Sequence, residues 1–419
     1  MKILVVGGGG REHAIIWKLS QSAKKPELYC APGNGGIVSI ATCVPIKATD
    51  VAAMVEYAKK ERFDLVVVAP DDPLALGMVD ELEKAGIRAF GPCAAAARIE
   101  SSKVFAKDLM KKYGIPTAGY EVFDSPDTAL AYLATCLYPT VVKADGLALG
   151  KGVIICKTEE DAKDAVHKIM VDRVFGDSGA RVIVEEFIEG PEVSVLCFVD
   201  GKNIEPMVSS QDHKRAYDKD EGPNTGGMGT FAPTPKYTAE IEEEVTRSIL
   251  LPTVEAMAKE GAPFKGVLYY GLMLTKDGPR VLEYNARFGD PETQVVLPLL
   301  KTDLIDIMNA TIDGTLDTMN VAWEQGACVC VVMASGGYPG SYEKGFEITG
   351  LDALEDRSGI IVFHAGTQIK EGKTVTAGGR VLGVTAKGKD IAAAREKAYA
   401  AVKDIHFEGA HFRRDIGNK

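Results

Sequence analysis

The sequence predicts a multidomain protein of mixed α/β and α+β class, and three observations support this. The chain has 419 residues, more than the roughly 250–300 at which one hydrophobic core stops growing. Short apolar runs alternate with helical patterns up to about residue 100, which is typical of βαβ units and a parallel sheet. Hairpin patterns and glycine-rich loops follow. We therefore predict an N-terminal parallel-sheet domain (1–101), a central domain (102–325) with a mobile lobe at about 117–190, and a small β-rich C-terminal domain (326–419).

The first domain and the start of the central domain show the clearest local signals. Five elements alternate in the first domain: strand 3–6, helix 12–19, strand 28–30, helix 51–60 behind Asp50 as N-cap, and strand 65–69. A helix at 103–113 should end at Gly114, a common C-terminal signal. The small lobe is predicted from three strands and one helix: 140–143, 153–156, 181–185 and 158–171.

Two hairpins and a long connection are predicted further along. The elements are strands 193–199 and 204–208, helix 238–260, strands 267–274 and 280–284, strand 328–334 and helix 391–404. The segment 209–235 is predicted as a long loop, and loops of that length inside a domain are usually functional or disordered.

Composition excludes several classes of partner. Hydrophobic residues make up 46% and charged residues 26% of the chain, as in ordinary globular proteins, and no apolar run is long enough to span a membrane. The net charge of −11 argues against a nucleic-acid or acidic-membrane partner. The eight cysteines lack metal-ligand spacing, so we expect free thiols in a reducing, cytoplasmic compartment. The first apolar run is too short for a signal peptide.

The run "VVGGGGREHA" after the first strand invites a dinucleotide interpretation, because amides at a helix N-terminus bind pyrophosphate. The third glycine of that fingerprint would fall on Glu12 or His13, and strand 28–30 does not end in a ribose-binding carboxylate. We therefore disfavour a nicotinamide site. A site for a smaller phosphate or part of a substrate, and a plain glycine turn, remain as alternatives.

The stretch "VVKADGLALGKGV" places Lys143 at a strand end, ahead of a glycine loop and Lys151. A mobile loop that closes over phosphates would explain the entropic cost of these glycines. It is not a Walker A loop, because no GxxxxGK[ST] pattern occurs here. The alternative is a surface hairpin with solvated lysines. The later stretch "VEEFIEGPEVS" has the position of a hinge.

The stretch "VLEYNARFGDPETQ" carries the densest chemistry. Glu283 and Asn285 are two apart in a strand and so point to one face, where their oxygens suit magnesium. Arg287 could bind a carboxylate or stabilise a transferring phosphoryl group. A helix should follow with Pro291 near its first position and Glu292 in its first turn. The alternative is an ordinary polar strand end.

Motifs along nearly the whole chain resemble the ATP-grasp superfamily and, within it, the glycinamide ribonucleotide synthetase family. They are "GGGGREHA", "APGNGG", "FGP", "KADGLALGKGV", "SQDHKR", "GPNTGGMG", "YNARFGDPETQ", "GGYPG", "FHAGT" and "GGRVL". The resemblance implies a pre-ATP-grasp N-terminal domain, a central ATP-grasp domain whose lobe is a lid, and ATP-dependent ligation of glycine to 5-phosphoribosylamine. The products would be glycinamide ribonucleotide, ADP and phosphate, formed through glycyl phosphate in purine biosynthesis. It also implies Mg²⁺ or Mn²⁺ and small-molecule substrates, and we expect a monomer.

The resemblance also assigns roles to residues. ATP would be bound by residues of the lid, its hinge and the adjoining body: Lys103, Lys143, Gly150, Lys151, Gly152, Glu185, Glu186, Phe187, Ile188 and Glu192. Metal would be held by Glu283 and Asn285. The catalytic residues would be Asp212, Lys214 and Arg287. The other substrates would be bound by residues of two turns and one loop: Gly9, Gly10, Arg215, Asp290, Pro291 and Glu292.

Two departures from the family pattern and two alternative functions qualify this assignment. Gly271 stands where the superfamily often has a further metal carboxylate, and "APDDPL", with Asp71 and Asp72, replaces a Gly-Pro-Glu sequence. Another ATP-grasp carboxylate–amine ligase or a related carboxylase would differ around "SQDHKR" and "RFGDPETQ". A nucleotide-sensing protein would bind ATP without turnover.

Overall fold

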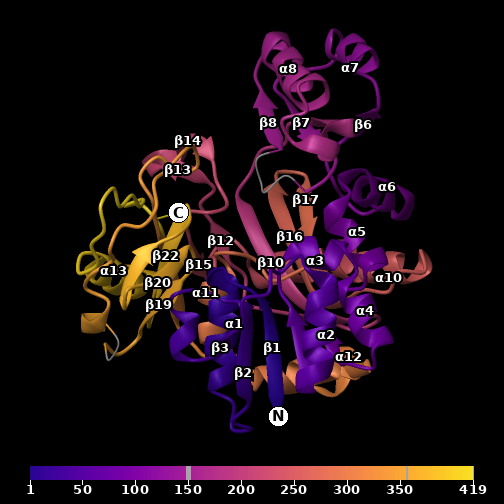
Figure 1. Ribbon diagram of the computed structural model, residues 1–419. Coiled ribbons are helices and arrows are strands. Elements are labelled where there is room, and N and C mark those ends of the chain that lie inside the picture. Colours follow the sequence, from indigo (N-terminus) through magenta and orange to yellow (C-terminus); the bar gives the residue numbers. More distant parts are fainter. Residues whose placement is uncertain (148–151, 355–356, 419) are drawn as a thin grey trace.

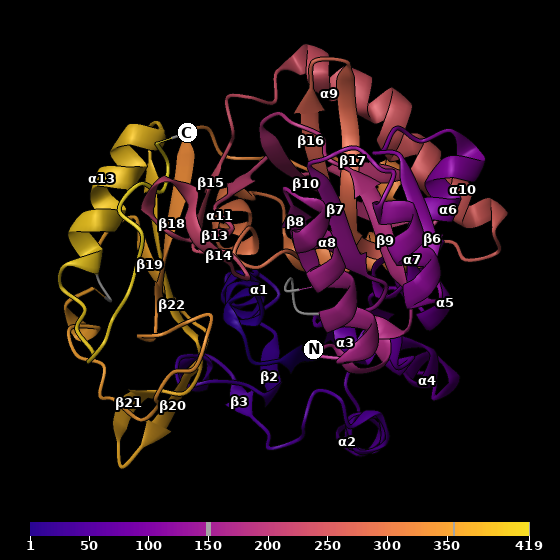
Figure 2. The same cartoon turned by 90° about the horizontal axis from the view of Figure 1, so that it is seen from above.

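The computed structural model describes residues 1–147, 152–354 and 357–418. In Figure 1 the N-terminal domain lies at the bottom, the small lobe stands at the top, and the C-terminal sheet lies at the left. The central sheet lies between them. In the view from above, in Figure 2, the lobe lies in front of the central strands and the C-terminal sheet lies at the left.

The N-terminal domain is a parallel sheet with the strand order β3-β2-β1-β4-β5. Its strands are β1 (Lys2–Gly7), β2 (Glu27–Pro32), β3 (Thr42–Cys43), β4 (Leu65–Val68) and β5 (Ala89–Phe90), and its helices are α1 (Gly10–Ser20), α2 (Val51–Glu61), α3 (Asp71–Ala75), α4 (Met78–Lys84) and α5 (Ala94–Ser101). Asp50 caps α2 by accepting a hydrogen bond from the backbone N–H of Ala53. Because parallel strands end at one sheet edge, the glycine run after β1 and Asp71 after β4 lie at the same edge.

The central body is an antiparallel sheet with the order β11-β10-β16-β17. Its elements are α6 (Lys103–Tyr113), β10 (Glu192–Asp200), β11 (Ile204–Pro206), α9 (Ala239–Val245), α10 (Leu251–Lys259), β16 (Lys265–Thr275), β17 (Gly278–Asn285), α11 (Thr293–Val296) and α12 (Leu304–Asp313). The predicted helix 238–260 contains a π-helical segment, Thr246–Leu250, between α9 and α10. The prediction that Pro291 lies near the first helical position, with Glu292 in the first turn, was wrong. Helix α11 begins only at Thr293, and Glu292 occupies its N-cap.

The small lobe, which the sequence predicted as a lid at about 117–190, has a sheet and a core of its own among its described residues. Its sheet has the order β6-β9-β7-β8 and is flanked by two α-helices. The elements are β6 (Tyr120–Phe123), α7 (Pro126–Leu133), β7 (Thr140–Ala144), β8 (Val153–Cys156), α8 (Glu159–Val166) and β9 (Val182–Glu186). Val142, Ile169 and Val182 are fully buried in one apolar cluster confined to the lobe. A lobe with a separate core can move as a unit, because few apolar contacts cross its boundary.

The C-terminal sheet recruits strands from the segment that was predicted as a long loop. Its order is β12-β15-β18-β22-β19, from β12 (Gln211–Asp212), β15 (Gly229–Ala232), β18 (Ala327–Ala334), β19 (Ile360–His364) and β22 (Arg380–Gly388). Between them lies the hairpin β13 (Arg215–Tyr217) and β14 (Glu221–Asn224), and the region also contains β20 (Thr367–Lys370), β21 (Lys373–Thr376) and α13 (Ile391–Val402). Phe231 pairs with Val329 and is fully buried. The segment 209–235 is therefore ordered by the C-terminal sheet, and the loop prediction was wrong.

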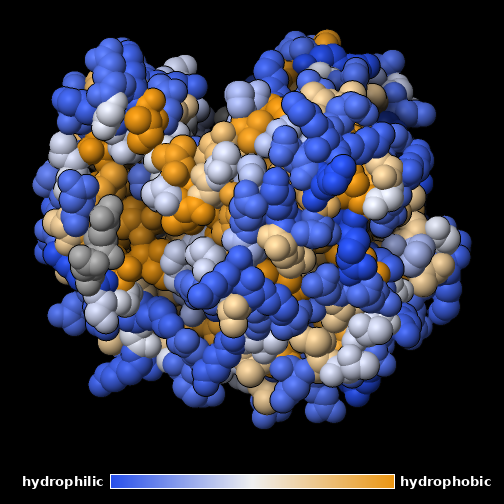
Figure 3. Space-filling model, turned by 60° about the horizontal axis from the view of Figure 1, so that its bottom comes forward, coloured by the Kyte–Doolittle hydropathy of each residue, from blue (hydrophilic) through white to orange (hydrophobic). Residues whose placement is uncertain are grey.

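The apolar residues lie mostly inside the molecule. Hydrophilic residues dominate the face drawn in Figure 3, and hydrophobic ones are most visible where the surface is hollowed at its left. All eight cysteines are free thiols, five of them buried and three half-buried. Within the described ranges, no helix combines the length and apolarity needed to cross a membrane.

Candidate active site

The end of the β16–β17 hairpin presents the two predicted metal ligands. Glu283 and Asn285 both lie on β17 with one residue between them, and both are half-buried. Glu283 pairs with Gly271 of β16 in the strand register, and a bulge follows at Leu272. The absence of a side chain at Gly271 leaves the space beside Glu283 open, since a Cβ there would lie 3.1 Å from its Cγ. Both residues therefore lie on one strand, two positions apart, as the sequence predicted.

Three lysines converge electrostatically on Glu283. Lys214 first of all, then Lys143 and Lys103, lower the pKa of Glu283 to about 2, against the opposing effect of burial. The Nζ of Lys214 lies 3.4 Å from Oε1 of Glu283 and 3.2 Å from Oε2 of Glu192. Burial acts to lower the pKa of Lys214, but these two carboxylates outweigh it and raise that pKa. The Glu283 side chain therefore stays ionised at neutral pH, with about a third of its surface exposed (34%).

The donors present fit a divalent metal bound jointly with phosphates. Glu283 supplies an ionised oxygen and Asn285 an amide oxygen, and both are hard ligands of the kind that magnesium prefers. No group of three or more His, Cys, Asp or Glu side chains placed to hold a metal occurs among the residues described. The protein thus offers a partial coordination shell, which leaves positions for phosphate oxygens and water.

Lys103 and Lys143 approach the same region from the body and the lid. Lys103, at the start of α6, donates from Nζ to the carbonyl oxygen of Gly146, at 2.8 Å. Burial lowers the pKa of Lys103, and the charge of Glu283 opposes that effect. Lys143, on β7, donates to the carbonyl oxygen of Leu282, at 3.2 Å, which places its ammonium beside β17. A hollow of about 450 Å³ opens nearby between the body (Ser101, Ser102) and the lid (Gly146, Ser178, Arg181).

The predicted hinge and lid residues are only partly described. Gly150 and Lys151 lie outside the described residues. The carbonyl oxygen of Gly152 accepts a hydrogen bond from the backbone N–H of Ala144, at 2.9 Å. Glu185 and Glu186 end β9, where Glu185 is buried and Glu186 exposed. Phe187 and Ile188 follow them, half-buried, and lead from the lid toward Glu192 and β10.

Arg287 is held by a carboxylate that the sequence did not point to. Its Nη2 lies 2.8 Å from Oε1 of Glu100 and donates to Oδ1 of Asn285, at 3.2 Å. The other oxygen of Glu100 accepts from the backbone N–H of Ala286, at 2.7 Å. The Nε of Arg287 is buried, and the described residues provide no hydrogen-bond partner for it. An oriented guanidinium with a free donor can bind a further anion.

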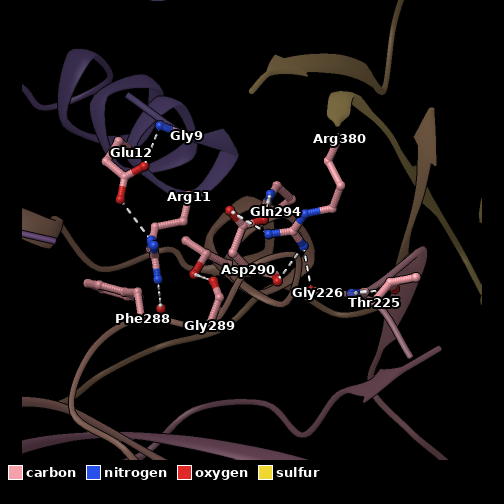
Figure 4. Close-up of polar contacts among 12 residues, drawn as sticks. Gly9, Arg11, Glu12, Thr225, Gly226, Phe288, Gly289, Asp290, Gln294 and Arg380 are labelled. Carbon is pink, nitrogen blue, oxygen red and sulfur yellow. Dashed lines mark hydrogen bonds and ion pairs between the residues drawn. The ribbon is translucent and has the colours of Figure 1, made fainter. Parts of the chain in front are cut away.

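The "GDPE" turn forms a second cluster, at the junction of the N-terminal and C-terminal domains (Figure 4). Arg380 of β22 reaches Asp290, with Nη1 donating to its carbonyl oxygen at 2.8 Å and Nη2 lying 3.5 Å from Oδ2. Burial acts to raise the pKa of Asp290, but Arg380 and Arg11 lower it overall. Gly9 and Gly10 face the same turn, since a Cβ on Gly10 would lie 3.5 Å from Oδ1 of Asp290.

Two carboxyl groups, the half-buried Asp212 and the buried Glu292, lie beside this turn. Burial, and next the charge of Glu292, raise the pKa of Asp212 well above its usual value. Burial likewise raises the pKa of Glu292, which accepts a hydrogen bond from Ser194, at 3.2 Å. Gly227 separates Asp212 from Pro291, and a Cβ there would lie 2.8 Å from Oδ1 of Asp212 and 2.5 Å from Cδ of Pro291. With φ at +110°, this position favours glycine.

Arg215 was predicted to bind substrate, but its described contacts do not connect it to the cluster around Asp290. Its Nη1 donates to the carbonyl oxygen of Gly222 within the β13–β14 hairpin, at 2.7 Å. Its backbone oxygen accepts from Arg413, at 3.1 Å. The substrate contact assigned to Arg215 therefore stays a prediction.

The glycine run after β1 is partly filled by the protein's own carboxylate. Oε2 of Glu12 accepts from the backbone N–H of Gly9, at 2.6 Å, and Oε1 lies 2.7 Å from Nε of Arg11. A carboxylate already takes an amide that a pyrophosphate would need, which counts further against a dinucleotide site. Arg11 then reaches the carbonyl oxygen of Phe288, at 3.1 Å, and Asp71 lies within electrostatic reach of Arg11. The segment "APDDPL", which departs from the family pattern and enters α3 at Asp71, thus faces the site.

Several residues of this site carried no assigned role in the sequence. Arg11 and Arg380 lie inside the motifs "GGGGREHA" and "GGRVL", so the motifs pointed to the segments without indicating what their cations contact. Glu100 lies three residues before Lys103 in no recognisable motif.

Three models of one family match the chain. They are the phosphoribosylglycinamide synthetase N domain at residues 1–100, the ATP-grasp (A) domain at 101–293 and the C domain at 328–419. A phosphoribosylamine–glycine ligase of Caldanaerobacter subterraneus subsp. tengcongensis is 52% identical over 416 residues, which cover 99% of both chains. The trifunctional purine biosynthetic protein adenosine-3 of Gallus gallus is 50% identical over 99% of this chain and 42% of its own length.

Solved structures show the same relationship. A phosphoribosylamine–glycine ligase from Thermotoga maritima superimposes with a TM-score of 0.86 and 36% identity, over 99% of this chain and 100% of that one. The biotin carboxylase domain of a Hydrogenobacter thermophilus 2-oxoglutarate carboxylase, solved with MgADP and bicarbonate, has a TM-score of 0.75 at 16% identity, over 98% of this chain and 91% of that one. The second likeness extends to the fold alone.

Proposed function

Because the chain belongs to the phosphoribosylglycinamide synthetase family of ATP-grasp enzymes, we propose that it ligates glycine to 5-phosphoribosylamine in purine biosynthesis, with ATP as the energy source. The products are glycinamide ribonucleotide, ADP and phosphate. The observation that carries the proposal is the convergence of Lys103, Lys143 and Lys214 on Glu283, beside Asn285 and the anchored Arg287.

The reaction proceeds in two displacements. A carboxylate oxygen of glycine attacks the γ-phosphorus of ATP, which releases ADP and gives glycyl phosphate. The amine of phosphoribosylamine then attacks the carbonyl carbon, and phosphate leaves as the amide forms. The amine loses a proton in this step. Asp212 is a candidate acceptor, because burial and Glu292 raise its pKa above the usual value, which makes its ionised carboxylate a stronger base.

Each cation has a role that its position supports. Lys103 and Lys143 bind the phosphates of ATP, and Lys214 lies between Glu192 and Glu283 at the edge of the same site. Two unit charges about 4 Å apart attract by ~4 kcal/mol at an effective dielectric near 20, so a few such cations suffice to bind ATP to an acidic protein. Arg287 aligns the glycine carboxylate or the acyl phosphate. Glu283 and Asn285 hold Mg²⁺ or Mn²⁺, which neutralises phosphate charge when bound.

The lid protects the intermediate. Acyl phosphates hydrolyse, so the lobe at 117–190 closes over the nucleotide and excludes water. The adenosine lies along Glu185, Glu186, Phe187 and Ile188, with Glu192 near the ribose. The ribosylamine is bound at the Asp290 turn with Gly9, Gly10, Glu292 and Arg215. The domain boundaries at 101/102 and 325/326, a monomeric state and a cytoplasmic location belong to the same proposal.

A turnover assay with phosphoribosylamine generated in situ tests this function. Phosphate release should require ATP, glycine and the ribosylamine together, and Glu283→Ala should form almost no product. Glu61→Ala is the matched control, because Glu61 also lies 3.4 Å from a lysine, Lys2, with its side chain about equally exposed (32%), but on the surface of the N-terminal domain. ATP binding without substrate-dependent turnover would instead favour a nucleotide-sensing protein.

A further inference from the structure

Lys107 is a buried lysine that the proposed mechanism does not use. It lies on α6, one turn after Lys103, and its side chain is only 3% exposed. Its Nζ lies 3.1 Å from Oε2 of Glu185 and donates to Oγ1 of Thr117 at 2.8 Å and to the carbonyl oxygen of Ala118 at 3.4 Å. An ammonium has three hydrogens, so these three acceptors satisfy it.

These acceptors belong to both places where the chain crosses between the body and the lid. Thr117 and Ala118 lie where the chain enters the lid, and Oγ1 of Thr117 donates in turn to the carbonyl oxygen of Val281 on β17, at 2.7 Å. Glu185 lies on β9, just before the chain leaves the lid. The two crossings also touch, because the backbone N–H of Glu186 donates to the carbonyl oxygen of Gly119, at 2.8 Å. Lys107 therefore connects helix α6 of the body to both segments through which the chain crosses between the body and the lid.

Glu185 is shared between two lysines. Its Oε2 lies 2.9 Å from Nζ of Lys143 as well as 3.1 Å from Nζ of Lys107, and its side chain is 3% exposed. Its Oε1 is buried and has no hydrogen-bond partner in the part of the chain that the structure describes. Two ammonium groups therefore share one buried carboxylate, and Lys143 also acts on the charge of Glu283. Removing one of the two ammonium groups leaves Glu185 with a single counter-ion, and loss of a partner from a buried ion pair is costly.

We propose that Lys107 is a positioning residue for nucleotide binding. It keeps Glu185 paired, so that Lys143 can leave Glu185 and form an ion pair with the phosphates of ATP. The inference rests on the proposed function in taking ATP as the nucleotide. When Lys143 moves to a phosphate, Lys107 remains as the counter-ion of Glu185, and no buried carboxylate is left unpaired. Without Lys107, Lys143 would be the only counter-ion, and ATP would have to break a buried ion pair to reach it.

A double-mutant cycle on Lys107→Met and Glu185→Gln tests this exchange. In the Glu185 background, Lys107→Met should raise both the KM for ATP and the Kd for MgATP, measured by calorimetry, roughly tenfold, within the range of couplings seen inside one ion-pair network. In the Glu185→Gln background the same substitution should change either constant less than about threefold, because Lys143 no longer has a carboxylate to hold it. The KM for glycine should stay unchanged throughout.

Controls separate this role from simple loss of folding. Lys265→Met is the matched control, because Lys265 is a half-buried lysine of the body whose Nζ donates to the carbonyl oxygen of Ile312, at 2.7 Å. It should leave both ATP constants unchanged, and circular dichroism should show all variants folded. Equal effects of Lys107→Met in both backgrounds would overturn the inference and leave a purely structural role.

The two readouts also separate this inference from the proposed function. If the wild type turns over but Lys107→Met changes neither the KM for ATP nor the Kd for MgATP, the inference is refuted and the proposed function stands. Absence of turnover in wild type, with the predicted changes in MgATP affinity, would refute the proposed function and leave the role of Lys107 in nucleotide binding intact.

Discussion

Replacing Glu100 by glutamine should both destabilise the protein and impair catalysis through Arg287. The ion pair of Glu100 with Arg287 spans 2.8 Å, a gross Coulomb energy of ~6 kcal/mol at an effective dielectric near 20. Desolvation offsets part of this, but removal of one partner from a buried pair typically costs about 3–5 kcal/mol. The glutamine side chain could still accept one of the two hydrogen bonds that Glu100 accepts, so we expect a loss of about 3 kcal/mol.

The expected shift in melting temperature follows from the length of the chain. At about 2.1 cal/mol/K per residue, unfolding of 419 residues as one unit carries an entropy of ~0.9 kcal/mol/K. A loss of about 3 kcal/mol then lowers Tm by roughly 3–4 °C. The value of kcat should fall by more than about tenfold, because Arg287 loses the carboxylate that orients it. Calorimetry and the phosphate-release assay measure the two effects.

Glu347→Gln is the matched control for Glu100→Gln. Glu347 forms an ion pair with Lys373 at 2.6 Å, close to the length of the Glu100 pair, but its side chain is 46% exposed. Exposed pairs contribute about 0–1 kcal/mol, so Tm should change by about 1 °C or less and kcat should not change. If Glu100→Gln were as mild as this control, burial would not govern the strength of the pair, and the reasoning about Arg287 would fail.

Two further predictions concern the metal ligand and the substrate turn. Lys214 and two other lysines lower the pKa of Glu283 to about 2. The ionised side chain therefore stabilises the fold fully above about pH 4.5, the usual pKa of a glutamate in the unfolded chain. This contribution is lost as the pH falls toward 2. Urea unfolding at several pH values should therefore show a constant difference between wild type and Glu283→Gln from pH 7 to about 5, and a shrinking one below that range. Arg380→Gln removes the ion pair with Asp290, so the KM for the ribosylamine should rise roughly tenfold while the KM for ATP stays the same. Equal rises in both KM values would show that Arg380 supports the fold as a whole.

Local patterns in the sequence predicted the elements whose cause is local. Three strands of the N-terminal domain (β1, β2 and β4), the helix Lys103–Tyr113 and the strand Val153–Cys156 lie within one or two residues of their predicted bounds, whereas the two-residue strands β3 and β5 were not predicted. Each is marked by its own periodicity or by an adjacent cap. The placement of Glu283 and Asn285 on one strand likewise follows from the two-residue repeat of a β-strand.

What the sequence could not predict depends on partners far along the chain. The strands Gln211–Asp212 and Gly229–Ala232 are two and four residues long, and they are strands because Phe231 pairs with Val329 in the C-terminal sheet. A short strand has no periodicity to detect, and its propensity depends on its neighbours. The pairing of Arg380 with Asp290 joins residues 90 positions apart, so the sequence indicated the charges without indicating which ones meet.

The carboxylates of this site explain how an acidic chain can keep cations ready for ATP. Lys143 has Glu185, Lys214 has Glu192 and Glu283, and Arg287 has Glu100 as partners. Without such partners, lysines gathered at one site would repel one another and shift toward their neutral forms. With them, each cation is positioned and charged, and a phosphate needs only to exchange one anionic partner for another. The exchange is favourable only where the released carboxylate keeps a second partner, which is why the shared position of Glu185 between Lys107 and Lys143 bears directly on nucleotide affinity.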